Sequence, residues 1–216
     1  MKYRSNFFLF LFFLFSIPLV QAQRVGLSGG ASVDPITSFR LSAIVESGES
    51  DWLSWQTELS YFQKGQTSLV DRLVDRVLEE RPDFGYGALD MISWPVFLKL
   101  KMQLSDFSVY LMAGPEIGYI FRGLVVYSLE DGSYKRESVS LENYQIKRWD
   151  LGATVGMGLE KKIRKDQRIF VDFRYYQGFN NINLDTSSVL SLEAFYFNFG
   201  MFIPLQKAAK EQSQAH

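Results

Sequence analysis

Hydrophobic and polar residues alternate along most of this chain. Between Trp149 and Glu160 every odd-numbered residue is apolar, and every even-numbered residue is charged, polar or glycine. The same period of two recurs from Ile169 to Gly178 and from Phe195 to Ile203. A period of two places successive side chains on opposite faces of a β-strand. The pattern therefore predicts strands whose two faces meet different surroundings.

Alternating segments recur eight times. Their approximate spans are 24–33, 38–46, 51–63, 89–102, 106–122, 146–161, 168–178 and 189–204. Most of them reach the ~9–11 residues that a tilted strand needs to cross a bilayer. An even number of antiparallel strands suits a closed barrel. We therefore expect an all-β protein, an eight-stranded antiparallel transmembrane β-barrel over residues 23–205.

The connections between these segments alternate in length. Residues 47–50, 103–105 and 162–167 form short polar turns, whereas 64–88 and 123–145 are long. Short periplasmic turns and long extracellular loops are typical of outer-membrane barrels. A soluble β-sandwich has no reason to show this asymmetry. The pattern predicts an outer-membrane location with the first strand starting in the periplasm.

The two long loops contain order of their own. In the first, apolar residues recur at helical spacing, Ser68 is a candidate N-cap and Pro82 would stop the helix, which predicts a short helix over 68–81. This helix is either a lid on the barrel rim or a docking surface for a partner or the outer leaflet. In the second loop, Asp131-Gly132 favours a tight turn. The strands on either side are expected to extend past the membrane as a hairpin.

The two ends of the chain are expected to lie outside the barrel. Lys2 and Arg4 precede an apolar run from Phe7 to Val20, and Val20-Gln21-Ala22 has small or β-branched residues at the positions that a signal peptidase reads. The run is shorter than the ~20 residues of a membrane-spanning helix. We predict a cleaved signal peptide over 1–22, with an uncleaved membrane anchor as the alternative. Residues 206–216 are expected to form a polar C-terminal tail.

The inward face of the predicted barrel carries charges of both signs. An eight-stranded barrel is just wide enough for side chains to fill, and a buried charge is costly unless it is paired. We therefore expect an ion-pair network across the lumen. Its predicted members are Arg40, Glu58, Lys99, Lys101, Glu116, Arg122, Asp150, Glu160, Asp172 and Arg174. The network is either a structural plug or the lining of a narrow ion path or small-ligand site.

The opposite face is rich in aromatic residues. The outward aromatics expected to form girdles at the two membrane interfaces are Trp55, Tyr61, Trp94, Tyr119, Trp149 and Tyr175. Pro95 lies within a strand and lacks a backbone donor, so we expect a locally broken ladder or a bulge there.

Few residues suited to catalysis are present. The sequence has no cysteine and one histidine, His216, the last residue of the tail. We therefore expect no enzyme activity, no catalytic residue, no metal and no cofactor, although a carboxylate-only hydrolase stays open. A net charge of −1 argues against nucleic acid as a partner.

Five short motifs, in order along the chain, resemble one known family. They are Glu58-Leu59-Ser60-Tyr61 with Lys64-Gly65, Trp94-Pro95-Val96-Phe97-Leu98-Lys99, Ala113-Gly114-Pro115-Glu116 with Gly118, Asp150-Leu151-Gly152 with Gly156 and Gly158, and Arg174-Tyr175-Tyr176-Gln177-Gly178 with Asn180 and Asn181. Together they resemble the PorT-like, porin-family outer-membrane β-barrel domain common in Bacteroidota. The resemblance implies the barrel fold, the outer-membrane location and a link to protein secretion. The chain departs from the usual barrel end at Pro204, after which the polar tail follows.

Three functions remain open from the sequence. The first is a structural or interaction barrel, in contact with outer-membrane lipid and with envelope or secretion-system proteins through its long outer loops. The second is a narrow channel, or a path for a small ligand, through the charged lumen. The third is a soluble calyx that binds a lipid, which the charged inward face disfavours.

Overall fold

The computed structural model describes residues 22–33, 37–48, 50–66, 85–128, 133–142, 146–164, 167–182 and 191–205. These residues form strands and the connections between them. The strands are β1 (Ala22–Val33), β2 (Thr37–Ser47), β3 (Leu53–Gln66), β4 (Gly85–Leu104), β5 (Phe107–Ser128), β6 (Tyr134–Val139), β7 (Trp149–Arg164), β8 (Gln167–Gly178) and β9 (Glu193–Pro204).

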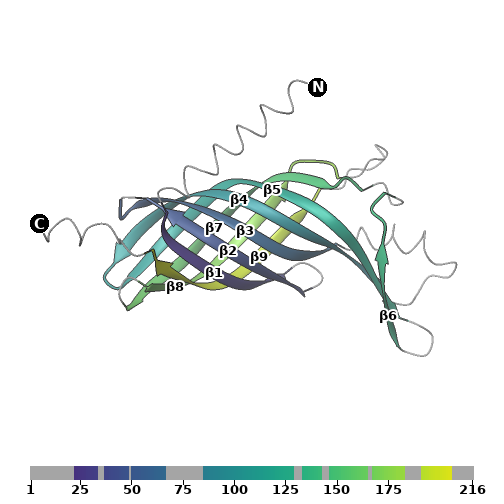
Figure 1. The fold of residues 1–216 in the computed structure, drawn as a ribbon, viewed down its shortest axis with the longest axis horizontal. Helices are drawn as coiled ribbons and strands as arrows, with labels where there is room; N and C mark the ends of the chain where they lie inside the picture. The colour runs from purple at the N-terminus through teal and green to yellow at the C-terminus, as the bar shows by residue number, and fades with distance from the viewer. Residues whose placement is uncertain are drawn as a thin grey trace, which may run out of the picture.

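Eight of these strands close into an antiparallel barrel (Figure 1). The order of neighbours is β4-β3-β2-β1-β9-β8-β7-β5, and pairing of β4 with β5 closes the ring. β6 lies outside the ring, because it pairs only with the part of β5 beyond its contact with β7. The predicted eight-stranded barrel is thus confirmed, with one additional short strand attached.

The two ends of the barrel differ. At one end, which we call the turn end, residues 48–52, 105–106 and 165–166 join the strands. At the other, the loop end, the connections are 34–36, 67–84, 129–148 (which include β6) and 179–192. The tight connection after β2 depends on Gly48, whose φ of 153° and close approach to the Leu53 carbonyl leave no room for a Cβ.

Burial follows the predicted alternation. On β9, each residue from Glu193 to Ile203 is exposed if odd-numbered and buried if even-numbered. The exposed set is apolar from Phe195 onward, and the same holds for the outward positions of β4 and β7. An exterior made of Leu, Ile, Val, Phe and Trp side chains is suited to hydrocarbon rather than water. The predicted girdle aromatics are all exposed or half-exposed on this outer face.

The ladder is interrupted at Pro95, as predicted. Between β3 and β4, Thr57 pairs with Val96 and Ser60 with Ser93, but Pro95 has no partner in β3. The Thr57 side chain fills the gap, because its Oγ1 donates a hydrogen bond of 3.1 Å to the Pro95 carbonyl. The hydroxyl therefore replaces a backbone donor at the break.

The predicted hairpin at the loop end forms between β5 and β6, where Gly123 pairs with Val139 and Ser128 with Tyr134. Its second arm does not continue into the barrel as the sequence predicted. Instead β6 ends at Val139 and β7 begins at Trp149, and Leu141 and Ile146 between them are buried in an apolar cluster. Figure 1 shows the long strands β4 and β5 projecting beyond the ring toward β6.

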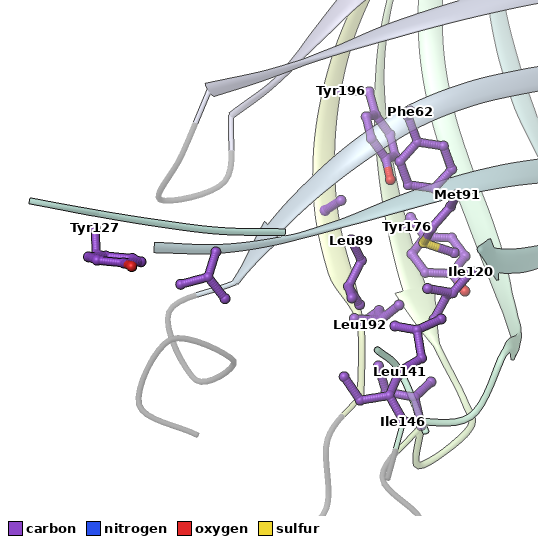
Figure 2. Packing of buried hydrophobic residues seen from close by; sticks show 13 residues of the cluster. Phe62, Leu89, Met91, Ile120, Tyr127, Leu141, Ile146, Tyr176, Leu192 and Tyr196 are labelled. Carbon is purple, nitrogen blue, oxygen red and sulfur yellow. The ribbon is translucent and has the colours of Figure 1, made fainter. Parts of the chain in front are cut away.

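An apolar cluster closes the loop end of the lumen (Figure 2). Inward residues of the strands supply Phe62, Met91 and Ile120, and the connections supply Leu141 and Ile146. Backbone hydrogen bonds hold these connections to each other, as from Lys147 N to Ile182 O at 2.7 Å. We call this cluster the apolar cap. It covers the charged interior from the loop side.

Several expectations fall outside the described residues. These are the signal peptide up to residue 21, the helix over 68–81, the Asp131-Gly132 turn, and the tail 206–216 with His216. Within the described part of the chain, no helix is long and apolar enough to span a membrane.

Candidate functional site: the charged barrel interior

The structure places nine of the ten predicted lumen charges inside the barrel, each buried. They are Arg40, Glu58, Lys99, Lys101, Glu116, Asp150, Glu160, Asp172 and Arg174. They come from β2, β3, β4, β5, β7 and β8, and gather into three groups along the barrel axis. Alternation on each strand is what brings them to a common interior.

The central group is built around Arg174 on β8. Its Nη1 donates to Glu58 Oε1 at 2.8 Å, and its Nε and Nη2 donate to both oxygens of Asp172 at 2.8 and 2.7 Å. Arg40 contacts the second oxygen of Glu58 at 3.3 Å. Tyr110 on β5 and Asn198 on β9 donate to Asp172 at 3.0 and 2.7 Å. Each carboxylate in this group therefore has several donors.

A second group lies toward the turn end and centres on Lys99. Its Nζ is 3.0 Å from Glu46 on β2 and 3.0 Å from Glu160 on β7. Lys101 also pairs with Glu46, and Arg168 pairs with Glu160 at 2.6 Å. Lys99 thus ties strands from opposite sides of the ring together.

The third group lies under the apolar cap. Tyr176 donates to Asp150 at 2.5 Å, and Thr154 donates to Glu116 at 2.6 Å. The ammonium of Lys64 lies 4.5 Å from the centre of the Tyr176 ring. Asp150 and Glu160 lie in different groups, because Glu160 pairs with Lys99 toward the turn end.

Aromatic rings line the spaces between these charges. The Lys99 ammonium lies 3.9 Å from the centre of the Tyr110 ring, and the Arg174 guanidinium lies 5.2 Å from that of Phe97. Rings in such positions attract cations through their quadrupole. They also fill volume, so the interior is packed with side chains rather than open.

Arg122 is the exception among the ten, and its predicted inward position is wrong. A register shift between Asp90 and Met91 pairs Asp90 with Arg122 but Met91 with Ile120, which leaves Phe121 as an extra residue in β5. A bulge of this kind reverses the alternation beyond it. Arg122 therefore points outward, where its Nε donates to Asp90 at 2.5 Å.

Sequence reasoning also missed residues that the interior uses. Glu46 and Lys64 are buried, and they share the even-numbered face of Arg40 and Glu58 on β2 and β3. That shared parity was the signal that could have found them. Asp90 gave no such signal, because it lies on the outward parity of β4 and is nonetheless fully buried.

Two hollows of the surface lie on the outside of the barrel. The larger, about 470 Å³, is lined mainly by outward apolar residues such as Leu27, Leu59 and Trp94. The other, about 250 Å³, is lined by Val109, Met157 and Phe173 among others. Neither hollow gathers the charges of the interior into a site open to a substrate. In the described residues no group of three or more histidine, cysteine or carboxylate side chains is placed to hold a metal.

These features define a class. A closed antiparallel ring with an apolar exterior and an ion-paired interior is the construction of a membrane-spanning β-barrel. The chain belongs to the family described as "Outer membrane protein beta-barrel domain", whose model matches residues 8–183. It is therefore an outer-membrane protein of the Gram-negative type, with eight strands in the membrane.

Comparison with solved structures returns barrels of the same kind. Neisserial surface protein A has 11% identity over 85% of this chain and 96% of its own, with a TM-score of 0.46. Ail, the attachment invasion locus protein of Yersinia pestis, has 10% identity over 85% of this chain and 99% of its own, with a TM-score of 0.44. The outer membrane enzyme PagL has 12% identity over 84% and 99%, with a TM-score of 0.43. No curated protein matches the sequence.

Proposed function

We propose that this protein is a non-enzymatic outer-membrane barrel with a side-chain-plugged lumen and a structural or interaction role. The observation that carries the proposal is the central group, in which Arg174, Glu58 and Asp172 join across the interior at 2.7–2.8 Å. Such pairs fill the cross-section and leave little space for a solute. The apolar cap over the loop end adds a second closure.

The loop end is proposed to face the outside of the cell and to carry the interaction surface. Long extracellular loops and short periplasmic turns support this orientation. The β5–β6 hairpin extends farthest from the ring in Figure 1, and its arm exposes Lys135 and Arg136. A surface of this kind suits envelope or secretion-system proteins as partners. The PorT-like motifs support a source in Bacteroidota and a role in secretion or envelope maintenance.

A narrow channel is the second candidate. The charged groups of Lys99 and Arg174 succeed each other along the lumen, and such a line of charges can carry ions in a barrel that opens. The soluble calyx does not fit, because the apolar residues face outward and the charges face inward.

Planar-bilayer recording of the full chain separates the plugged barrel from the channel. The wild-type protein is expected to give no reproducible conductance steps. Arg174→Ala removes the central donor, and Lys135→Ala, on the exposed hairpin, is its matched control. Steady conductance by the wild type that Arg174→Ala abolishes would overturn the plugged-barrel proposal.

Folding of each variant is checked first, by the mobility difference between heated and unheated samples on gels. If Arg174→Ala does not fold, Lys99→Met serves in its place, and the wild-type recording already decides between the two functions. Photo-crosslinking from position 136 in intact cells then tests the interaction role. Capture of the same envelope protein from position 136 and from the turn-end position 106 would contradict a loop-end docking surface.

A further inference from the structure

Arg122 owes its outward direction to a single extra residue. Along β5, Glu116, Gly118 and Ile120 are buried, and the next two residues, Phe121 and Arg122, are both exposed. Without the bulge the arginine would continue the inward series toward the apolar cap. β-bulges commonly re-aim a side chain in this way. The fold thus places one guanidinium on the outer face, above a belt that is otherwise apolar.

A built set of polar groups holds this guanidinium in place. Asp90 is fully buried on the outward parity of β4. One of its oxygens accepts from Tyr61 at 3.2 Å and from Gln63 at 3.0 Å, and the other accepts from Arg122. These donors come from the two strands that flank β4. The carboxylate is thereby saturated, and it fixes the orientation of the arginine rather than remaining available to another cation.

The rest of the Arg122 side chain faces the surroundings of the barrel. Its exposed fraction is 44%, and its contacts with Asp90 use Nε and Nη2, along one edge of the guanidinium. A guanidinium carries five N–H donors in a planar fork. The opposite edge is therefore directed away from the carboxylate and can receive a second anion.

The level of Arg122 is the outer edge of the apolar belt. The Tyr61 ring lies between Phe39 and Phe121, with ring centres 5.5 and 6.2 Å away. Aromatic residues gather at membrane interfaces, and below them the outward positions Leu59 and Ile92 are exposed and apolar. A charged residue on the lipid-facing side is tolerated near the interface and not at the bilayer centre.

A second arginine lies beside the same bulge. The backbone oxygen of Arg148 accepts a hydrogen bond of 2.7 Å from Ile120, one residue before Phe121. Its side chain is 42% exposed and contacts Glu142, itself 80% exposed, at 3.2 Å. An exposed pair of this kind contributes little to stability and is readily exchanged for another partner. The outer end of the barrel therefore carries two exposed guanidinium groups, that of Arg122 on β5 and that of Arg148 just before β7, the strand that pairs with β5.

We propose that Arg122, together with Arg148, binds the phosphate group of an outer-leaflet lipid. Guanidinium groups bind phosphate through paired hydrogen bonds, and do so most strongly where water is partly excluded. A phosphate at headgroup level meets Arg122 already oriented by Asp90. The assignment to the outer leaflet rests on the proposed orientation, whereas the binding of lipid phosphate does not.

Native mass spectrometry of the full chain in a neutral detergent tests this binding directly. The probes are a phosphorylated lipid A and the same lipid after removal of its phosphates. The phosphorylated form is expected to bind the wild type, and Arg122→Gln with Arg148→Gln should weaken it about tenfold or more, as expected for loss of charge-assisted hydrogen bonds. Lys161→Gln removes an exposed charge on β7 near the turn end and should leave the affinity unchanged.

Three outcomes would overturn the proposal. The first is equal binding of the phosphorylated and dephosphorylated lipids. The second is an unchanged affinity in the double variant, or in Arg148→Gln alone if the double variant does not fold. The third is competition by inorganic phosphate at concentrations equal to those of the lipid, which would make this a site for the free anion. Since no result here depends on conductance or on protein partners, failure of this site and failure of the proposed function are distinguishable.

Discussion

Neighbouring residues of one strand meet opposite solvents in this protein. The side chain of Val155 on β7 is 52% exposed on the outer face of the barrel, which faces lipid in an outer-membrane protein. The side chain of Thr154 beside it is buried and donates a hydrogen bond to Glu116. A one-residue error of register would exchange these surroundings. Substitutions at single positions therefore report the facing of each strand.

Val155→Arg is expected to cost roughly 2–4 kcal/mol in the free energy of unfolding, because it places a charge at the depth of the hydrocarbon. The matched control is Ile163→Arg, which makes a similar change on the same face of the same strand, eight positions nearer the turn end. Near the interface the cost should fall to roughly 0–1 kcal/mol. Urea-induced unfolding from lipid vesicles measures the free energy of unfolding of both variants. Equal costs would show that the apolar, lipid-facing belt is not where we place it.

Single substitutions also measure how much the buried ion pairs contribute to the free energy of unfolding. Arg174→Ala leaves Glu58 and Asp172 without their shared donor, which should cost about 3–5 kcal/mol in a buried site. Lys135→Ala breaks an exposed pair with Glu137 and should cost about 0–1 kcal/mol. The same vesicle assay compares them, and a small loss for Arg174→Ala would mean that water reaches the central group.

At the scale of strands, the hydrogen-bonded ladders are interrupted beside Pro95 on β4 and Pro115 on β5. Pro95 lacks a partner in β3, and β5 approaches β4 closely where Gly114 faces Val96. A Cβ at Gly114 would overlap the Val96 carbonyl and lie 3.0 Å from the Phe97 Cα. The glycine is therefore required by the close approach of the two backbones.

Gly114→Ala is expected to destabilise the barrel by about 1–3 kcal/mol, the usual cost of forcing a packed region apart. Gly29→Ala is the control, since a Cβ there meets only Leu41 Cδ2 at 3.8 Å. That substitution should be neutral or stabilise by about 0.4–1 kcal/mol through the unfolded chain. A similar loss in both variants would contradict the role given to the β4–β5 contact.

Much of the strand architecture could be predicted, because alternation and loop length are local properties of the sequence. The alternation along each strand predicted that Lys99 and Arg174 face inward, without any information on how the strands pair in the ring. It failed at Arg122, because a bulge depends on how two strands pair and leaves no mark in one strand alone. The break between β6 and β7 also escaped prediction, since it depends on burial of Leu141 against residues far away in the chain.

For the whole molecule, the asymmetry between the two ends defines an orientation that can be tested. The sequence has no cysteine, so each introduced thiol is a unique label. Ser138→Cys, exposed on β6, is expected to react with a membrane-impermeant maleimide in intact cells. Asp106→Cys, exposed in the turn after β4, should react only after the outer membrane is opened. The opposite labelling pattern would mean that the loop end faces the periplasm, and it would contradict the assignment of Arg122 to the outer leaflet.

The pairing of Lys99 with Glu46 and Glu160 has a consequence for how the barrel is made. The three residues lie on β4, β2 and β7, so their contacts form only when the ring is nearly complete. Until then each carries an uncompensated charge in a region that the finished protein keeps dry, which costs several kcal/mol per group. Partly closed sheets are therefore unstable, and we expect the barrel to close in one cooperative step. The interior charges therefore favour the correct strand register during assembly, because a barrel with slipped strands would leave these charges without ion-pair partners.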